Sequence, residues 1–325
     1  MNTQKKKTVS VVMCTYNGEK YIREQLDSLL LQTIQPNEII VIDDCSTDST
    51  YKILCNYKEQ HPNLIHLERN NQNLGINKNF FKAMDMATSD YIAISDQDDI
   101  WEPNKIEEQI QAINENLMCV CAYRPFTTTG AALRWDHRIP NYSLLRQVFV
   151  GCLPGHTMLI SKKLLDLLPN VDNMHRYYDV ILSMVAEAYC SITYINKVLV
   201  HHRMHITSAT YTPPTDNTMN YKNILKNIIQ TWKYNKLLKP KIRIRLTNTL
   251  AFLEQIKSDT TELENAKKII HLYTSKSFIN FIQLQWFCIR HYKDLFYTTV
   301  KFNLLSILRA AYFPISCSEY FRFLL

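Results

Sequence analysis

Residues 91–101 read Tyr-Ile-Ala-Ile-Ser-Asp-Gln-Asp-Asp-Ile-Trp, an apolar run followed by three carboxylates within four positions. Short apolar runs are typical of buried strands, and carboxylates this close repel one another unless a cation lies among them. In an extended segment Asp96 and Asp98 would project to the same side. Their oxygens suit Mg²⁺ or Mn²⁺, which keeps positions open for substrate phosphates. We therefore expect a divalent metal site where this strand ends; a solvated acidic turn is the alternative.

Three earlier apolar runs alternate with helical patterns, which is typical of a parallel sheet covered by helices. These predicted strands are Val9 to Cys14, Glu38 to Asp43 and Leu64 to Leu67. We expect Ser46 or Thr47 to cap a helix carrying Ile53 and Leu54. Trp101-Glu102-Pro103 is expected to begin another, with proline near its first turn.

Polar groups also follow the first two predicted strands. Cys14-Thr15-Tyr16-Asn17 ends the first with groups able to stack on and hydrogen bond a base, and Asp43 and Asp44 end the second. Ligands of open α/β sheets bind at such strand ends, so three neighbouring ends should line one crevice. A helix N-terminus favours anions, so we expect one of Asp43 and Asp44 to cap the next helix and the other to bind ligand.

The 325-residue chain carries a net charge of +7 that is unevenly distributed. Residues 220–325 hold 17 Lys and Arg against six Asp and Glu, so the earlier part is net negative at −4. We place a boundary near residue 215, which separates a first domain (1–215) from a basic, mainly helical region (216–325). A basic region suits an anionic membrane surface, which aromatic residues would enter. The candidates are Trp232, Trp286, Phe287 and Phe302.

Two alternatives compete with the membrane role of this basic region. It could simply pack on the first domain. Nucleic acid is a weaker candidate, because the basic residues lie among aliphatic ones and form no recognition motif.

Nine cysteines, an odd number without a CxxC pair, argue against a disulfide framework and favour a reducing cytoplasm. The start of the chain lacks a cleavage-type sequence after its short apolar run. The longest uncharged apolar stretches, such as Ser277 to Ile289, fall short of the roughly 18 residues that a spanning helix needs. We expect a cytoplasmic protein without a membrane-spanning segment, whose basic region could reach the inner face of the plasma membrane.

Four motifs in order resemble the family 2 glycosyltransferases of the GT-A fold, and within them the rhamnosyltransferase-like branch of bacterial surface-polysaccharide enzymes. They are Val9-Ser-Val-Val-Met-Cys-Thr-Tyr-Asn-Gly, Ile40-Val-Ile-Asp-Asp-Cys-Ser-Thr-Asp, Asn73-Leu-Gly-Ile-Asn-Lys-Asn-Phe and Ser95-Asp-Gln-Asp-Asp-Ile-Trp. The resemblance covers residues 9–105 strongly and 150–208 more weakly. It implies an α/β GT-A fold, a Rossmann-like, mostly parallel sheet flanked by helices, followed here by the helical C-terminal region.

The resemblance also implies roles for individual residues. Cys14, Thr15, Tyr16, Asn17 and Asp44 would form the pocket for the nucleotide. Lys78 would contact phosphate or sugar, Asp96 the ribose, and Asp98 the metal. His202-Arg203-Met204-His205 resembles a Tyr-Arg-x-His segment, in which Arg203 would meet phosphate and His205 would complete the Mn²⁺ or Mg²⁺ ligands.

Asp179 resembles the general base of the same branch. A His-Asp-Trp-like segment follows a Thr-Gly-containing strand there, and here Gly155-His-Thr-Met-Leu-Ile is followed by Tyr177-Tyr178-Asp179-Val180. Tyrosine replaces the usual histidine and valine the usual tryptophan. Asp179 could instead cap a helix or form a salt bridge.

The implied activity is a metal-dependent, inverting transfer of sugar from a nucleotide-diphosphate sugar to a hydroxyl of a saccharide or lipid-linked saccharide. A sugar nucleotidyltransferase would need a glycine-rich loop, but Asn17-Gly18-Glu19 has one glycine. A degenerate, membrane-bound scaffold would be expected to lack the metal carboxylates.

Overall fold

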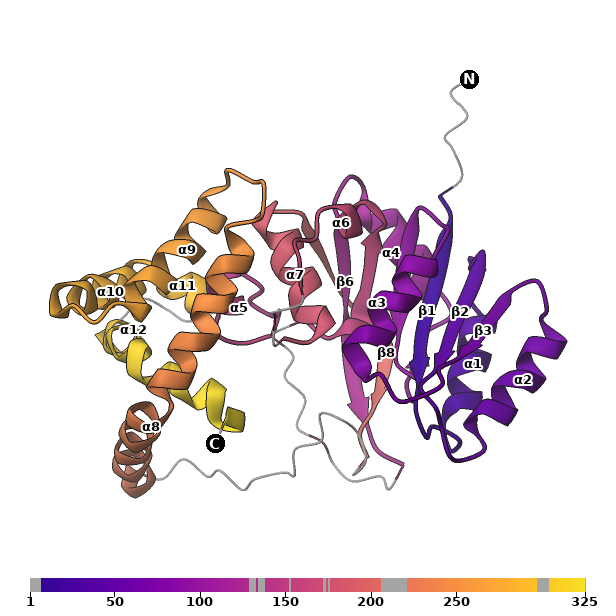
Figure 1. Cartoon of the computed structure of the whole chain (residues 1–325), viewed down its shortest axis with the longest axis horizontal. Coiled ribbons are helices and arrows are strands. Elements are labelled where there is room, and N and C mark those ends of the chain that lie inside the picture. The colour runs from indigo at the N-terminus through magenta and orange to yellow at the C-terminus, as the bar shows by residue number, and fades with distance from the viewer. Residues whose placement is uncertain are drawn as a thin grey trace.

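The computed structural model describes residues 7–128, 133, 138–151, 153–171, 174, 176–205, 221–296 and 304–324, with backbone alone for 221–230, 319 and 322–324. A part built on a sheet and a helical part lie next to each other along the longest axis (Figure 1). The predicted boundary near residue 215 lies outside the described residues.

Eight strands form one sheet in the order β3-β2-β1-β4-β7-β6-β8-β5. Their bounds are β1 Val9–Thr15, β2 Glu38–Asp43, β3 Ile65–Arg69, β4 Tyr91–Ser95, β5 Ile100–Trp101, β6 Met118–Phe126, β7 Met158–Ser161 and β8 Ile192–Arg203. The pairs β1–β2, β2–β3, β1–β4 and β6–β8 are parallel. β7 pairs antiparallel with β4 and β6, and β5 pairs antiparallel with β8. The predicted mostly parallel sheet is confirmed.

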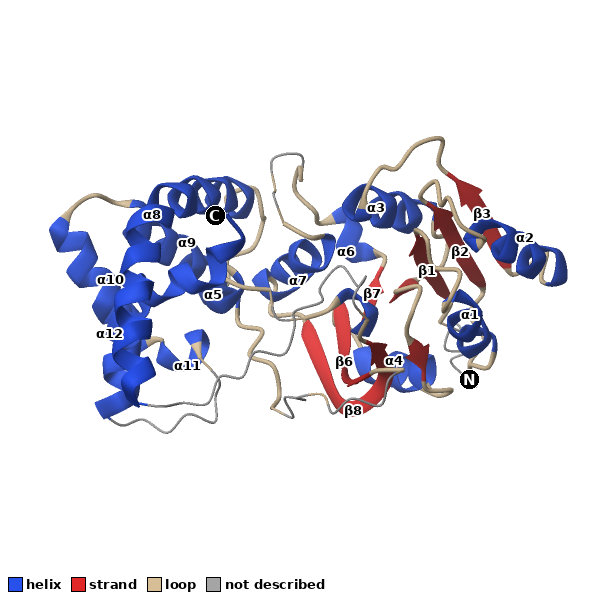
Figure 2. Ribbon diagram, turned by 90° about the horizontal axis from the view of Figure 1, so that it is seen from below, coloured by secondary structure: helices blue, strands red, loops and turns tan. Residues whose placement is uncertain are grey.

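Helices cover both faces of this sheet (Figure 2). The helices of this part are α1 Ile22–Leu30, α2 Thr50–Gln60, α3 Ile76–Met86, α4 Lys105–Ile113, α5 Leu144–Gln147, α6 Lys163–Asp166 and α7 Tyr178–Ala188, with the 3₁₀ turn η1 Gly155–Thr157. Successive side chains of a strand point to opposite faces, so Val11 and Met13 of β1 pack with α1, α2 and α4, while Val12 packs with α3 and α7. All six residues of β2 are therefore buried, as expected for a sheet covered on both faces.

The predicted strands all form, and two helix starts are wrong. Glu38–Asp43 and Tyr91–Ser95 have the predicted bounds. Neither Ser46 nor Thr47 caps α2, whose N-cap is Ser49 and whose first amide, that of Thr50, donates to Asp48 Oδ1 at 2.9 Å. Trp101 lies in β5 and not in a helix, because it pairs with β8, and α4 begins later at Lys105.

The C-terminal part consists of α8 Tyr221–Leu253, α9 Thr261–Thr274, α10 Phe278–Arg290, α11 Tyr292–Leu295, α12 Leu304–Ser316 and the 3₁₀ segment η2 Cys317–Leu324. These helices pack against α5 and α7, which lie between the two parts (Figures 1 and 2). Phe149 makes edge-to-face contacts with Tyr273 of α9 and Phe313 of α12. One apolar core therefore runs through both parts.

The aromatic residues predicted to enter a membrane differ in exposure. Trp232 and Trp286 are exposed, whereas Phe287 is buried on the inner face of α10, so the prediction for Phe287 is wrong. Phe302 lies outside the described residues. None of the described helices is long and apolar enough to cross a bilayer. All eight described cysteines are free thiols.

Gly155 in η1 provides a test of the packing behind the sheet. A Cβ at this position would lie 2.0 Å from Tyr178 Oη, although the backbone of Gly155 is not left-handed. Tyr178 is buried and stacked on Phe80, with ring centroids 4.1 Å apart, so it cannot simply move away. We expect Gly155→Ala to lower the free energy of unfolding by about 1–3 kcal/mol in denaturant titrations. In a Tyr178→Leu background the same change should cost much less; an equal cost there would contradict this explanation.

Candidate active site

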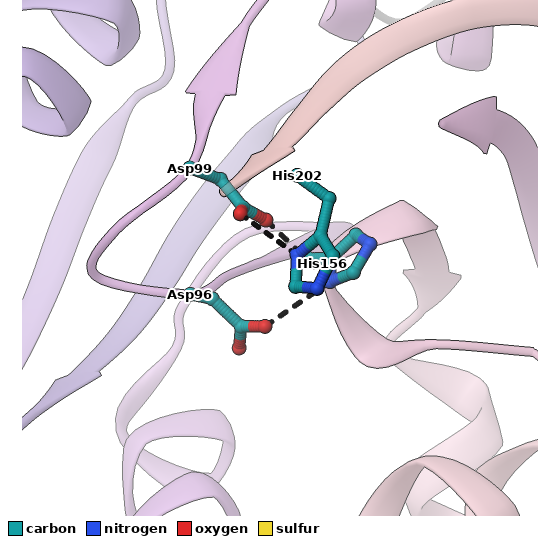
Figure 3. A group of neighbouring side chains, drawn as sticks. All are labelled: Asp96, Asp99, His156 and His202. Atoms are coloured by element: carbon teal, nitrogen blue, oxygen red, sulfur yellow. Dashed lines mark hydrogen bonds and ion pairs between the residues drawn. The ribbon is translucent and has the colours of Figure 1, made fainter. Parts of the chain in front are cut away.

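The carboxyl ends of three neighbouring strands meet at one edge of the sheet. β1 lies between β2 and β4, so the residues after Thr15, Asp43 and Ser95 are adjacent in space. The predicted adjacency of these three strand ends is confirmed. The turn after β4 contains the carboxylates, and η1 and β8 supply histidines to it (Figure 3).

The turn of residues 96–99 bends and is not extended as predicted. Asp96 Oδ2 lies 3.1 Å from His156 Nδ1, whereas Asp98 Oδ2 lies 2.7 Å from His205 Nε2. The two carboxylates therefore contact different histidines. The bend arises because Asp99, which follows them, is drawn inward and is fully buried.

Asp99 is the centre of a buried network. Its Oδ1 accepts hydrogen bonds from the Arg203 amide and from His202 Nδ1, both at 3.0 Å. Its Oδ2 lies 3.5 Å from His156 Nδ1 and has no closer hydrogen-bond partner among the residues that the structure describes. Burial raises the pKa of Asp99, but His156, His202 and the Arg203 amide outweigh it, so the net shift is downward. Asp99 is therefore held as a carboxylate.

His156 lies between two of the carboxylates and is itself 3% exposed. Burial lowers its pKa, but Asp99 and Asp96 outweigh burial and raise it. The ring stacks on His202 with centroids 4.6 Å apart, and its Nε2 is buried without a hydrogen-bond partner among the described residues. Figure 3 shows both rings beside the two carboxylates.

Two sets of residues in this site could hold a metal ion. Asp96, Asp99, His156 and His202 each offer one atom, and these atoms lie within 4.8 Å of one another. The predicted pair, Asp98 and His205, is the second set, with side chains 14% and 16% exposed. Burial, Asp96 and Asp99 raise the pKa of Asp98, and His205 lowers it. A cation would relieve this crowding of negative charge.

Arg203 is committed to the support of the same turn. Its Nε donates to the Asp98 carbonyl at 2.8 Å, and its Nη2 donates to Glu24 at 2.9 Å. The guanidinium also lies 4.6 Å from the ring centroids of Tyr21 and Phe126. The predicted phosphate contact of Arg203 stays a prediction.

Asp44 and Asp43 hold loops together, and the predicted helix cap is wrong. Asp44 accepts hydrogen bonds from Asn70 Nδ2 and from the amides of Leu74 and Gly75. Burial raises the pKa of Asp44, but these bonds outweigh it and lower the pKa. Asp43 accepts from Ser46 and lies 3.3 Å from Arg69 Nε, so neither carboxylate reaches the amides of α2. The nucleotide contact of Asp44 stays a prediction.

The end of β1 presents a mixed surface at this edge of the sheet. Thr15 is buried and donates to Asp43, while Tyr16 is 48% exposed, with its amide donating to Gln97. Asn17 has a left-handed backbone (φ 49°), and its side chain accepts from the Thr47 amide. Burial and the carboxylates of Asp96 and Asp44 raise the pKa of Cys14 well above its usual range. Tyr16 is the aromatic residue among these four, and its side chain is exposed, as stacking on a base would require.

Asp179 lies in the first turn of α7, where Asp96 and His156 act on it electrostatically. Burial is the main cause that raises its pKa to about 6; the Val180 amide, which donates at 2.8 Å, opposes this shift. The Asp179 carboxylate is half-buried. Lys78 is exposed on the first turn of α3 and has no ion-pair partner in the described part of the chain. The roles of both residues stay predictions.

The sequence predicts no individual role for His156 or His202, and includes Asp99 only as one of the three clustered carboxylates. Asp99 directly follows Asp98, and His202 directly precedes Arg203, so their positions beside predicted site residues could have identified them. His156 is 60 residues from Asp96 in the sequence, and only the pairing of β7 with β4 brings them together. Beneath them Lys105 is fully buried; burial lowers its pKa to about 8, although Cys121, Cys119 and Asp99 oppose the shift.

Comparisons with known proteins agree with this architecture. Residues 10–168 match the family model for Glycosyl transferase family 2. The dTDP-rhamnosyl transferase RfbG of Shigella flexneri is 40% identical over 162 residues, which are 47% of this chain and 55% of RfbG. TuaG of Bacillus subtilis, named for teichuronic acid biosynthesis, is 31% identical over 175 residues, 50% of this chain and 65% of TuaG. The chain spans 42–66% of the length of these and the other curated relatives it matches.

A solved structure is similar over nearly the whole chain. The mannosyltransferase PcManGT of Pyrobaculum calidifontis, in complex with GDP-Man and Mn²⁺, has a TM-score of 0.51 at 15% identity. The match covers 97% of this chain and 84% of that one. Identity this low shows the fold alone, and it confirms the predicted GT-A fold with its helical C-terminal region.

The two neighbouring aspartates should differ in their effect on stability. Asp99→Ala removes a buried carboxylate and leaves the Arg203 amide and two histidines without their acceptor, so we expect a loss of about 3–5 kcal/mol in thermal or denaturant unfolding. Asp98→Ala also relieves repulsion from Asp96 and Asp99, and its effect should stay below about 1 kcal/mol in metal-free buffer. Equal losses would contradict the distinct roles described here.

Proposed function

We propose that this chain is a member of glycosyl transferase family 2, whose model residues 10–168 match, and that it transfers a sugar from a nucleotide-diphosphate sugar to a hydroxyl acceptor. One observation carries this proposal. A crowded acidic turn at the carboxyl end of β4 contacts His156 and His205. Asp179 interacts electrostatically with both Asp96 and His156. Such an arrangement offers a cation site for a diphosphate and a nearby carboxylate for an acceptor hydroxyl.

The donor would bind along the ends of β1, β2 and β4. Tyr16 offers its exposed ring to the base, with Cys14, Thr15 and Asn17 forming the floor. Asp44 accepts from the loop of residues 70–75, so any bond to a base N–H must use its remaining lone-pair capacity. Asp96 would accept from a ribose hydroxyl, and Lys78 and Arg203 would add positive charge near the phosphates.

We assign the divalent cation, Mn²⁺ or Mg²⁺, to Asp98 and His205. A metal that also binds phosphate oxygens needs ligands open to the crevice. Both members of the pair Asp98 and His205 are partly exposed. In the other set Asp96 and His202 are partly exposed as well, but Asp99 and His156 are buried and already engaged with each other, so only two of its four ligands would face a phosphate-bound metal. When bound, the cation would stabilise the negative charge that develops on the diphosphate leaving group. Asp99, His156 and His202 would then support the turn from below.

Asp179 is the proposed general base of an inverting displacement. The acceptor oxygen forms a bond to the anomeric carbon as the bond from that carbon to the diphosphate breaks. Asp179 takes the hydroxyl proton, and the diphosphate leaves with the electron pair of the broken bond. A pKa near 6 suits this role, since the carboxylate is ionised at neutral pH yet more basic than an exposed aspartate.

The acceptor is proposed to be a saccharide or lipid-linked saccharide of a bacterial surface polysaccharide, handled at an anionic membrane surface. The names of RfbG and TuaG support this class, and they make dTDP-rhamnose the first donor to test. The GDP-Man and Mn²⁺ of PcManGT support a nucleotide-sugar donor and a metal in this fold.

Metal and nucleotide binding should depend on Asp98, His205 and Asp96. We expect Asp98→Ala and His205→Ala to weaken Mn²⁺ binding at least 10- to 100-fold, measured by electron paramagnetic resonance of free Mn²⁺, and to abolish metal-dependent nucleotide binding. Asp96→Ala should also abolish it while the fold survives.

His156→Gln is the matched control for this metal assignment, because it alters the buried set of ligands but not the accessible one. It should keep Mn²⁺ affinity within a few-fold. Loss of Mn²⁺ binding in His156→Gln, with normal binding in His205→Ala, would move the metal to Asp96, Asp99, His156 and His202.

Turnover should depend on Asp179 while donor binding does not. Asp179→Asn keeps the shape but cannot accept a proton, so kcat should fall by roughly 10² or more with donor affinity within a few-fold. The anomeric configuration of the product, determined by NMR, should be inverted. A retained configuration, or near-normal turnover of the variant, would overturn this mechanism.

The pH profile provides a further control. The base must be ionised, so kcat should fall as pH decreases through about 6, the pKa of Asp179. The residual activity of Asp179→Asn should lack this acid limb. If the variant kept the same decrease in kcat at low pH, that decrease would have to arise from a titratable group other than Asp179.

A further inference from the structure

Two neighbouring helices of the C-terminal region each expose an apolar stripe. On α10 it consists of Phe278, Ile279, Ile282 and Trp286, and on α12 of Leu304, Leu305 and Leu308. This spacing places each set on one face of its helix. The helices pack together, with Gln285 Nε2 donating to the Ala311 carbonyl at 3.2 Å. Both lie at the end of the molecule away from the sheet (Figures 1 and 2).

A cavity opens beside the start of α10. Its volume of about 210 Å³ is several times the roughly 30 Å³ share of one water. The lining residues come from α8, α9, α10, α12 and the segment between α9 and α10, and they contain three cations but no carboxylate. The cations are Lys239, Arg243 and Lys276. The N-terminus of α10, which also favours anions, begins at this cavity.

The positive charge of this cavity is not neutralised by the described part of the chain. No described carboxylate forms a salt bridge with Lys239, Arg243 or Lys276. Arg243 donates through Nη2 to the Ser275 carbonyl at 2.9 Å, while its Nε is buried and has no hydrogen-bond partner within the described ranges. Burial and the neighbouring Arg243 lower the pKa of Lys239. An anion would therefore be stabilised here.

We propose that this cavity binds the phosphate group of an anionic membrane lipid while the stripes of α10 and α12 enter the bilayer. Phe278 connects the two features, because it lines the cavity and is also 76% exposed. A phosphate next to apolar surface is the chemistry of a lipid interface. A second copy of the chain fits less well, since an isologous contact would bring two uncompensated basic cavities together.

This inference rests on the proposed function in one respect, the anionic membrane surface at which the acceptor is handled, and it names the part of the chain that binds that surface. The cavity and the stripes take no part in the chemistry of sugar transfer. Donor hydrolysis in solution is therefore expected to be unchanged in every variant named below. If hydrolysis is absent from the wild type while vesicle binding is normal, the proposed function fails and the membrane site stands.

Vesicle sedimentation of the full chain tests the cavity. Lys239→Gln/Lys276→Gln should bind vesicles containing phosphatidylglycerol about 30-fold more weakly, roughly fivefold for each charge. Lys233→Gln/Lys236→Gln is the matched control: both lysines are exposed on α8, the charge change is the same, and neither lines the cavity. The control should lose no more than about threefold, and thermal melts should show that both variants fold. Equal losses of vesicle affinity in the two double variants would indicate diffuse electrostatic attraction and would overturn the proposal that the cavity binds lipid phosphate.

The fluorescence of Trp286 tests the apolar stripe. Its emission should shift to the blue when vesicles are added, and Trp286→Phe should remove this shift while Trp232→Phe retains it. Leu305→Ser should weaken vesicle binding, whereas Leu31→Ser, on the similarly exposed Leu31 after α1, should not. Stabilisation by inorganic phosphate without vesicle binding, or a dimer that Leu305→Ser dissociates, would overturn the proposal.

Discussion

Three negative charges share one turn at the sheet edge, and the way they are balanced determines the rest of the site. Asp96 is matched by His156, Asp98 by His205, and Asp99 by His202 with a second contact to His156. The histidines come from η1 and from the end of β8, so the second half of the domain must return to the sheet edge to supply them. The result is a division of the charge into a buried, neutralised part and an accessible part that remains available for a cation.

The sequence was informative wherever local pattern and final environment agree. Between their end residues β2 and β4 are apolar, because both faces of the sheet are covered, and so their bounds could be predicted from the sequence. The errors share a cause. The extended form expected for residues 96–99 fails because the Arg203 amide, more than 100 positions away, draws Asp99 inward. The expected cap of α2 fails because Asp48 is nearer to the first amides. His156 and the inward face of Phe287 depend on tertiary packing, which no local pattern encodes.

Several residues with predicted ligand roles also hold loops and turns in place through hydrogen bonds within the chain. Asp44 holds the loop of residues 70–75, and Arg203 joins the acidic turn to α1 through Glu24. A residue of this kind cannot be replaced without disturbing its neighbours, so loss of binding in a variant does not by itself identify a contact. Asp98 and Tyr16 are more informative positions, because fewer of the chain's own groups depend on their side chains.

The continuous core between the sheet and the helical region limits how the two parts can evolve. α7 carries Asp179 at its start, and at its end the Ala188 carbonyl accepts from Ser258 and Thr260 in the segment leading into α9. Phe149 is fixed by Tyr273 and Phe313 in the same way. The last hundred residues are therefore not an independent domain that could be exchanged between relatives. A chain recombined at this point would lose the matched contacts between α7 and the helical region, so substitutions on the two sides of this interface have to be compatible with each other.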